Sequence, residues 1–193
     1  MPWEKTFEIQ DAIDKAMHVF WTKGYVDTSI ADLLEATGLK RSSLYNAFGG
    51  KRDLFVKALR KYDRENSRAT LSQLEAIEDP HQAIQTLFEG VVQEALTDPD
   101  RKGCLLVNTS LELPTHDKEI QTIIKTGFRA VEAFLQRQIE LGQARSELPE
   151  SINPQETARA LVALIAGIRV LGRGAFEESA LRSIAAQALR LIS

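Results

Sequence analysis

A segment between residues 28 and 53 constrains the fold of this chain more than any other. Its sequence is TSIADLLEATGLKRSSLYNAFGGKRD. Three apolar residues in its first half are spaced for one face of a helix: Ile30, Leu33 and Leu34. Thr28 or Ser29 can cap this helix, because a side-chain oxygen there accepts from free amides of the first turn. Gly38 suits the left-handed conformation that ends a helix, so the segment predicts a short helix and a sharp turn.

The apolar pattern continues into a second helix of about two turns, through Leu39, Leu44 and Phe48. Its other side chains are polar and are expected to face solvent or a partner: Arg41, Ser42, Ser43, Tyr45 and Asn46. A short helix, a glycine-containing turn and a second helix with a polar outer face are typical of a DNA-binding helix-turn-helix. The same spacing fits an ordinary helical hairpin in a helical core, and the pattern alone favours neither.

The residue types shift that balance. The informative residues are Gly24, Tyr25, Thr28, Ser29, Ile30, Thr37, Gly38, Leu39, Leu44, Tyr45, Phe48 and Lys51. With these residues, the run 24–54 closely resembles the DNA-binding segment of the TetR/AcrR family of bacterial transcriptional regulators. Ala12, Ala16 and Phe20 extend the resemblance over roughly the first third of the chain. Two departures stand out, since Lys40 replaces the usual capping serine and Gly49-Gly50 replaces a common Pro-Ser pair.

Composition narrows the class of protein. The chain has 193 residues, of which 44% are hydrophobic and 26% charged, as in soluble globular proteins with a real core. Residues 1–62 carry 10 Lys and Arg against 8 Asp and Glu, whereas residues 63–193 carry 14 against 19. A mildly basic N-terminal part on an acidic body suits a protein whose N-terminal part meets nucleic acid.

Several other classes find no support in the sequence. The start of the chain lacks the apolar stretch of a signal peptide, and the longest apolar run, 160–168, is too short to cross a bilayer. Cys104 is the single cysteine, which fits a reducing cytoplasm, and we see no zinc-ligand spacing. We find no nucleophile elbow, no catalytic triad spacing and no phosphate-cradling glycine loop, so no motif indicates an enzyme. We therefore expect a cytoplasmic protein with no cofactor, no metal, no enzymatic activity and no membrane partner.

Helical periodicity runs through the rest of the chain without strand-like alternation, so the predicted fold class is all-α. The predicted helices cover residues 6–23, 51–75, 79–96, 117–141, 154–171 and 177–192, in addition to the two short ones. Asp79-Pro80 and Asn153-Pro154 are predicted to start helices as N-cap and first helical residue. We expect a helix-turn-helix domain over residues 1–50 and a helical regulatory and dimerisation domain over 51–193, with 51–75 as the connecting helix.

DNA recognition requires phosphate contacts that position the protein and base contacts that specify a sequence. By its match to the family, we assign positioning to Thr28, Tyr45 and Lys51, with Arg52 as a further candidate. Base-edge contacts are assigned to the second short helix and its entrance: Lys40, Arg41, Ser42, Ser43 and Asn46. Arg41 fits a guanine and Asn46 an adenine, although Arg41 equally fits a phosphate contact.

The resemblance implies a ligand pocket in the second half of the chain. The candidate lining residues lie on predicted helices: Phe88, Val92, Cys104, Leu106, Asn108, Phe128 and Phe134. Apolar residues at helical spacing also simply pack in a core, and this alternative stays open for each of them. Asn108 is the most informative, because a polar residue in an apolar run needs a partner if it is buried. Cys104 is either a redox sensor activated by Arg101 and Lys102 or a small buried hydrophobe.

The helix at 154–171 is apolar on nearly every side, which indicates that it is covered all round. One face of this helix fits the core of its own subunit, and the other fits a second subunit. We therefore expect helices 154–171 and 177–192 of two subunits to form a four-helix homodimer interface. A monomer with a central buried helix is the alternative. As the resemblance implies, we expect a repressor that binds a palindromic double-stranded DNA operator as a homodimer and is released by a small-molecule effector of unknown identity. The alternatives are a helical protein-binding adaptor and a redox-sensing repressor acting through Cys104.

Overall fold

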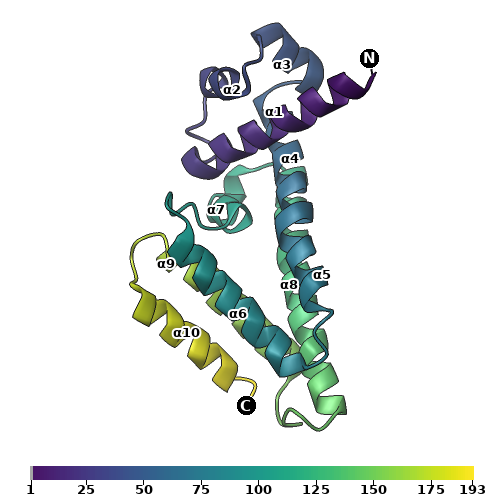
Figure 1. Ribbon diagram of the computed structural model, residues 1–193, viewed down its shortest axis with the longest axis vertical. Coiled ribbons are helices and arrows are strands. Elements are labelled where there is room, and N and C mark those ends of the chain that lie inside the picture. Colours follow the sequence, from purple (N-terminus) through teal and green to yellow (C-terminus); the bar gives the residue numbers. More distant parts are fainter. Residues whose placement is uncertain (1) are drawn as a thin grey trace. The chain divides into compact units, whose positions relative to one another are not determined.

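The computed structural model describes the backbone of residues 2–193 and the side chains from Ile9 onward. Over these residues the chain is helical and contains no β-strand, so the predicted all-α class is confirmed. The elements are α1 Pro2–Lys23, α2 Ile30–Thr37, α3 Arg41–Phe48, α4 Lys51–Tyr62, η1 Asp63–Arg68, α5 Ala69–Leu74, α6 Pro80–Thr97, α7 Leu105–Leu111, η2 Leu113–Thr115, α8 Lys118–Ala144, α9 Pro154–Leu171 and α10 Glu178–Arg190 (Figure 1). No helix in residues 2–193 combines the length and the apolar character that a bilayer crossing requires.

The described chain forms two compact units that interleave along the sequence. The first contains the residues up to Glu65 together with 104–124, and the second contains 66–103 and 125–193. In the first unit α7 packs against α1 and α4, so a segment from the second half of the sequence belongs to the N-terminal helices. This division differs from the sequence-based boundary after residue 50, which marks a change of expected function rather than of packing.

The core of the first unit lies under the two short helices. Ile13, Ala16 and Phe20 of α1 are buried in it, and α1 begins four residues before the predicted start at residue 6. Other fully buried members include Leu33 of α2, Leu44 of α3, and Leu54, Phe55, Ala58 and Leu59 of α4. Within this core α2 packs against α1 and α3 packs against α4, each through a few large apolar side chains.

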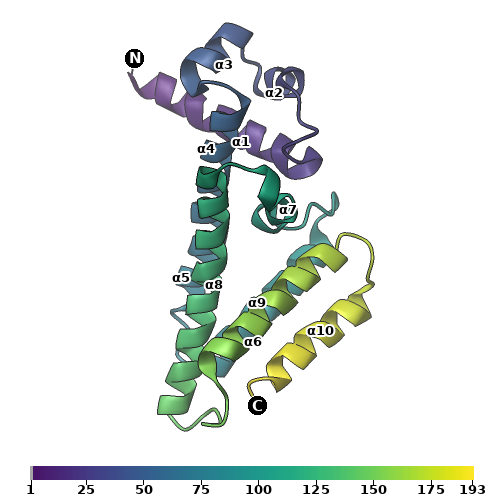
Figure 2. The ribbon, with the colours of Figure 1, turned by 180° about the vertical axis from the view of Figure 1, so that it is seen from behind.

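The second unit is a layer of helices around one apolar core. Views from opposite sides show α6, α9 and α10 lying side by side (Figure 1 and Figure 2). Residues of α5, α6, α8, α9 and α10 share the core, with Ile84, Phe88, Phe134, Leu135, Leu161, Ile168 and Ala188 fully buried. Two predicted helix starts are confirmed, since the side chains of Asp79 and Asn153 accept from first-turn amides ahead of Pro80 and Pro154.

Two helix predictions need correction. The predicted helix 51–75 is helical throughout to Leu74, but its residues 63–68 form the wider π-helix η1. This stretch, DRENSR, has no apolar side chain to fix an α-helical register against a core. The predicted loop from Gly142 starts later, because α8 continues to Ala144. A Cβ at Gly142 would lie 2.6 Å from Leu148, so the glycine lets the following chain fold back onto the helix.

Two glycines of the second unit provide a matched test of this packing. A Cβ at Gly172 would lie 2.8 Å from the Cβ of Ala95, so Gly172→Ala is expected to destabilise the fold by about 1–3 kcal/mol through overpacking. Gly90 is helical and exposed with no atom within 4 Å, so Gly90→Ala is expected to stabilise it by about 0.5–1 kcal/mol. Urea unfolding measures both, and equal effects at the two positions would contradict the close approach of α6 and α9.

Candidate nucleic-acid interface

The first short helix is anchored by its N-terminal cap. Ser29 is the N-cap of α2, and its hydroxyl accepts from the Asp32 amide at 3.1 Å, while the Ser29 amide donates to the Asp32 carboxylate at 2.8 Å. Lys23 at the end of α1 donates to the same carboxylate at 2.7 Å. These bonds hold the pKa of Asp32 well below its ordinary value, with the Lys23 hydrogen bond as the largest cause. The cap therefore also ties α2 to α1.

Thr28 is bonded within the protein. Its side chain is only 1% exposed, and its hydroxyl donates to the Gly24 carbonyl at 2.6 Å. The hydroxyl thus satisfies a carbonyl at the end of α1 and closes the loop between α1 and α2. Ser29 rather than Thr28 is the helix cap, and the phosphate contact of Thr28 stays a prediction.

The turn between the short helices has the predicted geometry. Gly38 has φ 72°, in the left-handed region, and its amide donates to the Leu34 carbonyl at 2.9 Å. The buried Thr37 hydroxyl donates to the Leu33 carbonyl at 2.6 Å, which closes the last turn of α2. The chain can therefore reverse within a few residues and start α3 at Arg41.

The second short helix exposes the polar face predicted for DNA reading. Leu44 and Phe48 are buried, whereas the remaining side chains of its first two turns are exposed: Arg41, Ser42, Ser43, Tyr45 and Asn46. The guanidinium of Arg41 lies 5.9 Å from the ring centroid of Tyr45, one turn along the helix. Lys40 is the exposed N-cap and makes no side-chain capping bond, as expected from the missing serine. The first turn of α3 therefore has no side-chain cap.

Two glycines connect α3 to the next helix. Gly49 has φ 83° and Gly50 has φ 146°, both in the region that side chains with a Cβ rarely adopt. A Cβ at Gly49 would also lie 2.7 Å from the Asp53 carboxylate. The Gly49-Gly50 pair thus fits this tight junction because neither residue has a Cβ, and it places the start of α4 directly after α3.

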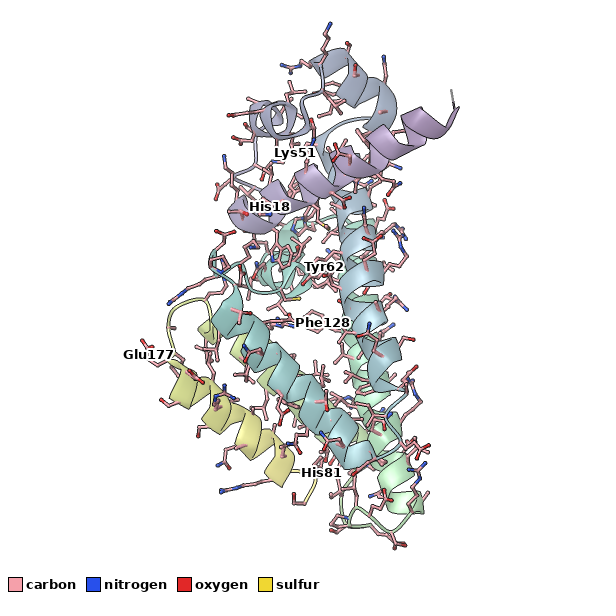
Figure 3. The ribbon with its side chains drawn as sticks, viewed as in Figure 1. His18, Lys51, Tyr62, His81, Phe128 and Glu177 are labelled. Carbon is pink, nitrogen blue, oxygen red and sulfur yellow. The ribbon has the colours of Figure 1, made fainter. Side chains whose placement is uncertain are left out.

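Lys51 lies at the first turn of α4, where a phosphate contact was predicted (Figure 3). Its ammonium group donates to the Val26 carbonyl at 3.2 Å and lies 4.5 Å from the ring centroid of Tyr25. Partial burial lowers the pKa of Lys51, while the nearby Asp27 and Asp32 carboxylates oppose this shift. In this arrangement Lys51 holds the loop between α1 and α2, so a phosphate contact remains a proposal that requires its ammonium to be shared or released.

Arg52 has partners that the sequence did not predict. Its guanidinium forms a bidentate pair with Asp117, with Nε at 2.8 Å and Nη2 at 3.0 Å from the two carboxylate oxygens. Nη2 also donates to Glu119 at 2.7 Å and Nη1 to Asp53 at 2.8 Å. The pKa of Arg52 is raised, with Asp117 as the largest cause, and the Arg52 hydrogen bond lowers the pKa of Asp117 to about 2. Arg52 is therefore engaged within the protein and is not free for phosphate in this arrangement.

An aromatic cluster lies beside this network. The Tyr25 ring packs against Phe55 at 4.7 Å and against His116 at 5.3 Å between centroids. His116 is buried against Phe55 as well, and burial lowers its pKa, with Glu112 and Asp117 opposing. These contacts join α4, the loop after α1 and the segment before α8. No local signal could have predicted them, because His116 and Asp117 are far from their partners in sequence.

The predicted ligand residues do not fall in one compact unit. Phe88, Val92 and Phe134 are fully buried in the core of the second unit, and Phe128 lies half-buried on α8 (Figure 3). Leu106 and Asn108 lie on α7 in the first unit, where Leu106 is buried and Asn108 half-buried. The first three fit the packed-core alternative, whereas the role of the others stays a prediction.

Cys104 is the partly buried N-cap of α7, a helix of seven residues. Of the two cations expected to activate its thiol, Lys102 is paired elsewhere: it donates to Asp98 at 2.7 Å and to Asp100 at 3.0 Å. Arg101 and the N-terminus of α7 remain beside the thiol, so a redox role of Cys104 stays a prediction. Among the residues that the structure describes, no group of three or more His, Cys, Asp or Glu side chains is arranged to hold a metal ion.

Two short helices at a glycine turn, the second with an exposed polar face, define a helix-turn-helix DNA-binding protein. Comparison with protein families agrees: residues 12–58 match the N-terminal model described as bacterial regulatory proteins, tetR family. Residues 80–188 match the tetracyclin repressor-like, C-terminal domain. This chain belongs to the TetR family of transcriptional regulators, as its sequence resemblance indicated.

Curated relatives support the assignment. The HTH-type transcriptional repressor ComR of Escherichia coli K12 is 31% identical over 188 residues, which cover 97% of this chain and 90% of ComR. An uncharacterized HTH-type transcriptional regulator of Bacillus subtilis strain 168, YezE, is 40% identical over 118 residues. That match covers 60% of each of the two chains.

Solved structures share the fold over nearly the whole chain. The TetR family regulator CifR, in a cysteine mutant complexed with 26bp double-strand operator DNA, has a TM-score of 0.81 and 25% identity. The structural match covers 95% of this chain and 96% of the CifR chain. A TetR family regulator from Agrobacterium tumefaciens has a TM-score of 0.88 at 21% identity, covering 97% of this chain and 98% of its own.

The Asp32 cap gives the fold a defined acid sensitivity. The folded-state pKa of Asp32 is depressed from 3.8, so its stabilisation is complete above that pH and is lost as the pH falls below it. Asp32→Asn is expected to unfold at a lower urea concentration than the wild type near neutral pH, and the difference should narrow as the pH falls below 3.8. Glu35→Gln, at an exposed position of the same helix, is the control and should match the wild type at every pH. A pH-independent gap for Asp32→Asn would contradict this account.

Proposed function

We propose that this protein is a homodimeric repressor that binds a palindromic DNA operator and is released by a small-molecule effector. In this proposal residues 1–50 read DNA, and residues 51–193 carry regulation and dimerisation. The exposed polar face of α3 is the observation that carries the proposal. The names of the relatives agree with it, since ComR is a transcriptional repressor and CifR was solved on operator DNA.

The face of α3 offers both kinds of contact that a DNA reader needs. Arg41 and Asn46 are exposed, and their side chains suit bidentate contacts to guanine and adenine edges in a major groove. Lys40, Tyr45 and the uncapped first-turn amides of α3 suit phosphate contacts, because amides at a helix N-terminus favour an anion. Ser42 and Ser43 lie on the same exposed surface and complete the proposed reading face.

The α9 helix supports the proposed dimer. Its sequence is apolar nearly all round, yet in a single chain Ala160, Ala163 and Val170 are exposed. A helix of this composition is normally covered on all sides. A second copy of α9 and α10 would cover that face, and a two-fold dimer would present two α3 helices to the two halves of a palindrome.

The effector acts, in this proposal, by binding one of two states of the regulator more tightly than the other. An effector that prefers the state with lower DNA affinity shifts the population and releases the operator. The match of residues 80–188 to a tetracyclin repressor-like C-terminal domain supports a ligand-responsive second half. Phe128, which is half-buried in the second unit, is the candidate that we retain for contact with the effector.

DNA reading by α3 is tested by Arg41→Ala combined with Tyr45→Ala. Against a duplex selected by the wild type from a random pool, the loss is expected to be about 1–3 kcal/mol of binding free energy for each lost base contact. Both residues are exposed, so the free energy of unfolding should change by no more than about 0.5 kcal/mol. Fluorescence anisotropy and urea unfolding measure the two quantities.

Lys125→Ala is the matched control, because it removes an exposed cation from α8 and should leave operator affinity unchanged. Full operator affinity in the α3 variant would refute α3 as the reading helix. If the wild type selects no sequence and binds all duplexes equally, the proposed operator function is wrong.

The dimer interface is tested by Ala163→Glu in the middle of α9. Because Ala163 is exposed in a single chain, the variant should fold, but a charge buried between two subunits without a partner opposes association. Sedimentation is expected to show a dimeric wild type and a monomeric variant. Ala133→Glu, at an exposed position of α8, should remain dimeric. A dimeric Ala163→Glu would place the interface elsewhere.

A further inference from the structure

We propose that Arg52 is a positioning residue for DNA recognition, which sets the position of α3 by fixing the first turn of α4 to the start of α8. This inference rests on the proposed DNA-binding function and assigns Arg52, Asp117 and Glu119 a role in it. Together we call these three residues the Arg52 clamp. The inference replaces the sequence-based view of Arg52 as a phosphate contact.

The geometry of the clamp is specific. The planar guanidinium meets both oxygens of Asp117 and one of Glu119, and the other oxygen of Glu119 accepts from Arg60 at 3.1 Å. Asp117 also accepts from the amides of Glu119 and Ile120 at 2.9 and 3.2 Å. The Asp117 carboxylate therefore both caps the first turn of α8 and binds α4. Because of this shared contact, a movement of the start of α4 displaces the start of α8, and the reverse.

The clamp holds the part of α4 that lies nearest to the reading helix. Arg52 is the second residue of α4, and Gly49 and Gly50 alone separate α4 from α3. Its neighbour Lys51 binds the Val26 carbonyl in the loop that leads to α2. Two consecutive cations thus attach the same helical turn to two different segments, and both attachments bear on the helix-turn-helix.

Exposure argues that the clamp sets orientation more than stability. The side chains of Arg52, Asp117 and Glu119 are 40%, 44% and 41% exposed. Ion pairs at such exposure add little to the free energy of folding, because water screens them. A bidentate guanidinium–carboxylate pair nevertheless imposes a direction on both partners. His116, packed against Phe55 and Tyr25 immediately before Asp117, holds the same segment from its apolar side.

The test compares Arg52→Lys, Arg52→Gln and Lys57→Gln in the full-length protein, with operator affinity measured across a range of salt concentrations. Arg52→Lys keeps the charge but loses the planar fork, so it should weaken operator binding by about fivefold or more, the lower end of coupling between sites. Lys57→Gln removes an exposed cation from the same helix and should bind as the wild type does. Urea unfolding should show all three variants folded with near wild-type stability.

The salt dependence separates positioning from direct phosphate contact. A lost phosphate contact lowers the log–log salt slope by about 0.9, as expected for Arg41→Ala if it meets a phosphate. Arg52→Gln should weaken binding without lowering the slope, because its charge is already neutralised inside the protein. A slope lowered by about 0.9 per subunit, or a wild-type affinity in Arg52→Lys, would overturn the proposal.

Asp117→Asn provides the second, independent readout. Asparagine retains the capping oxygen for α8 but loses the ionic bond to Arg52. Removing a negative charge near DNA by itself strengthens binding, whereas loss of the clamp weakens it. We expect weaker binding, and a double variant with Arg52→Gln no weaker than the single ones, since they remove one shared interaction.

Stronger binding by Asp117→Asn, or additive losses in the double variant, would refute the clamp. If the wild type binds its selected duplex no better than random DNA, the proposed function fails. In that case the salt slope of Arg52→Gln on random duplex DNA, compared with that of the wild type, still reports whether Arg52 contacts a phosphate, so the two failures are distinguishable.

Discussion

The reading surface depends on the burial of a few apolar side chains, because its two helices have eight residues each. Helices this short are not stable in water by themselves and need tertiary packing. Leu33, Leu44 and Phe48 provide it by packing into the core beneath α1 and α4. Since so few residues of α3 are needed for this core, the rest of its surface remains polar and exposed. The sparse core is thus the physical condition for a DNA-reading face.

The charges near this face divide into two groups. Lys40 and Arg41 are exposed at the start of α3, where they can meet DNA. Lys51 and Arg52 at the start of α4 are bound internally, to the Val26 carbonyl and to the carboxylates of the Arg52 clamp. In the proposed complex the cations available to DNA are therefore those at the start of α3. The cations of α4 instead determine how the reading helix is held, which links the geometry of the interface to the start of α8.

The second unit is built by different means. Its core is large and apolar, and close approach of its helices requires small residues, as at Gly172 beside Ala95. The outer face of α9 keeps apolar side chains, among them Ala163 and Val170, that a single chain leaves exposed. The first unit thus exposes polar groups suited to nucleic acid, and the second exposes apolar groups suited to another subunit. This division matches the roles that we propose for the two halves of a regulator.

Local chemistry by itself determined the N-terminal cap of α2, the helix starts at Pro80 and Pro154, and the left-handed turn at Gly38. Each depends on residues a few positions apart, through capping bonds, fixed proline geometry or the missing Cβ of glycine. The burial of Thr28 and the partners of Arg52 were decided only by the tertiary structure. Arg52 meets Asp117 across 65 residues of sequence, and nothing local to either residue specifies the other. A charged side chain has the same chemistry whether it faces DNA or a carboxylate, and packing decides which of the two it meets.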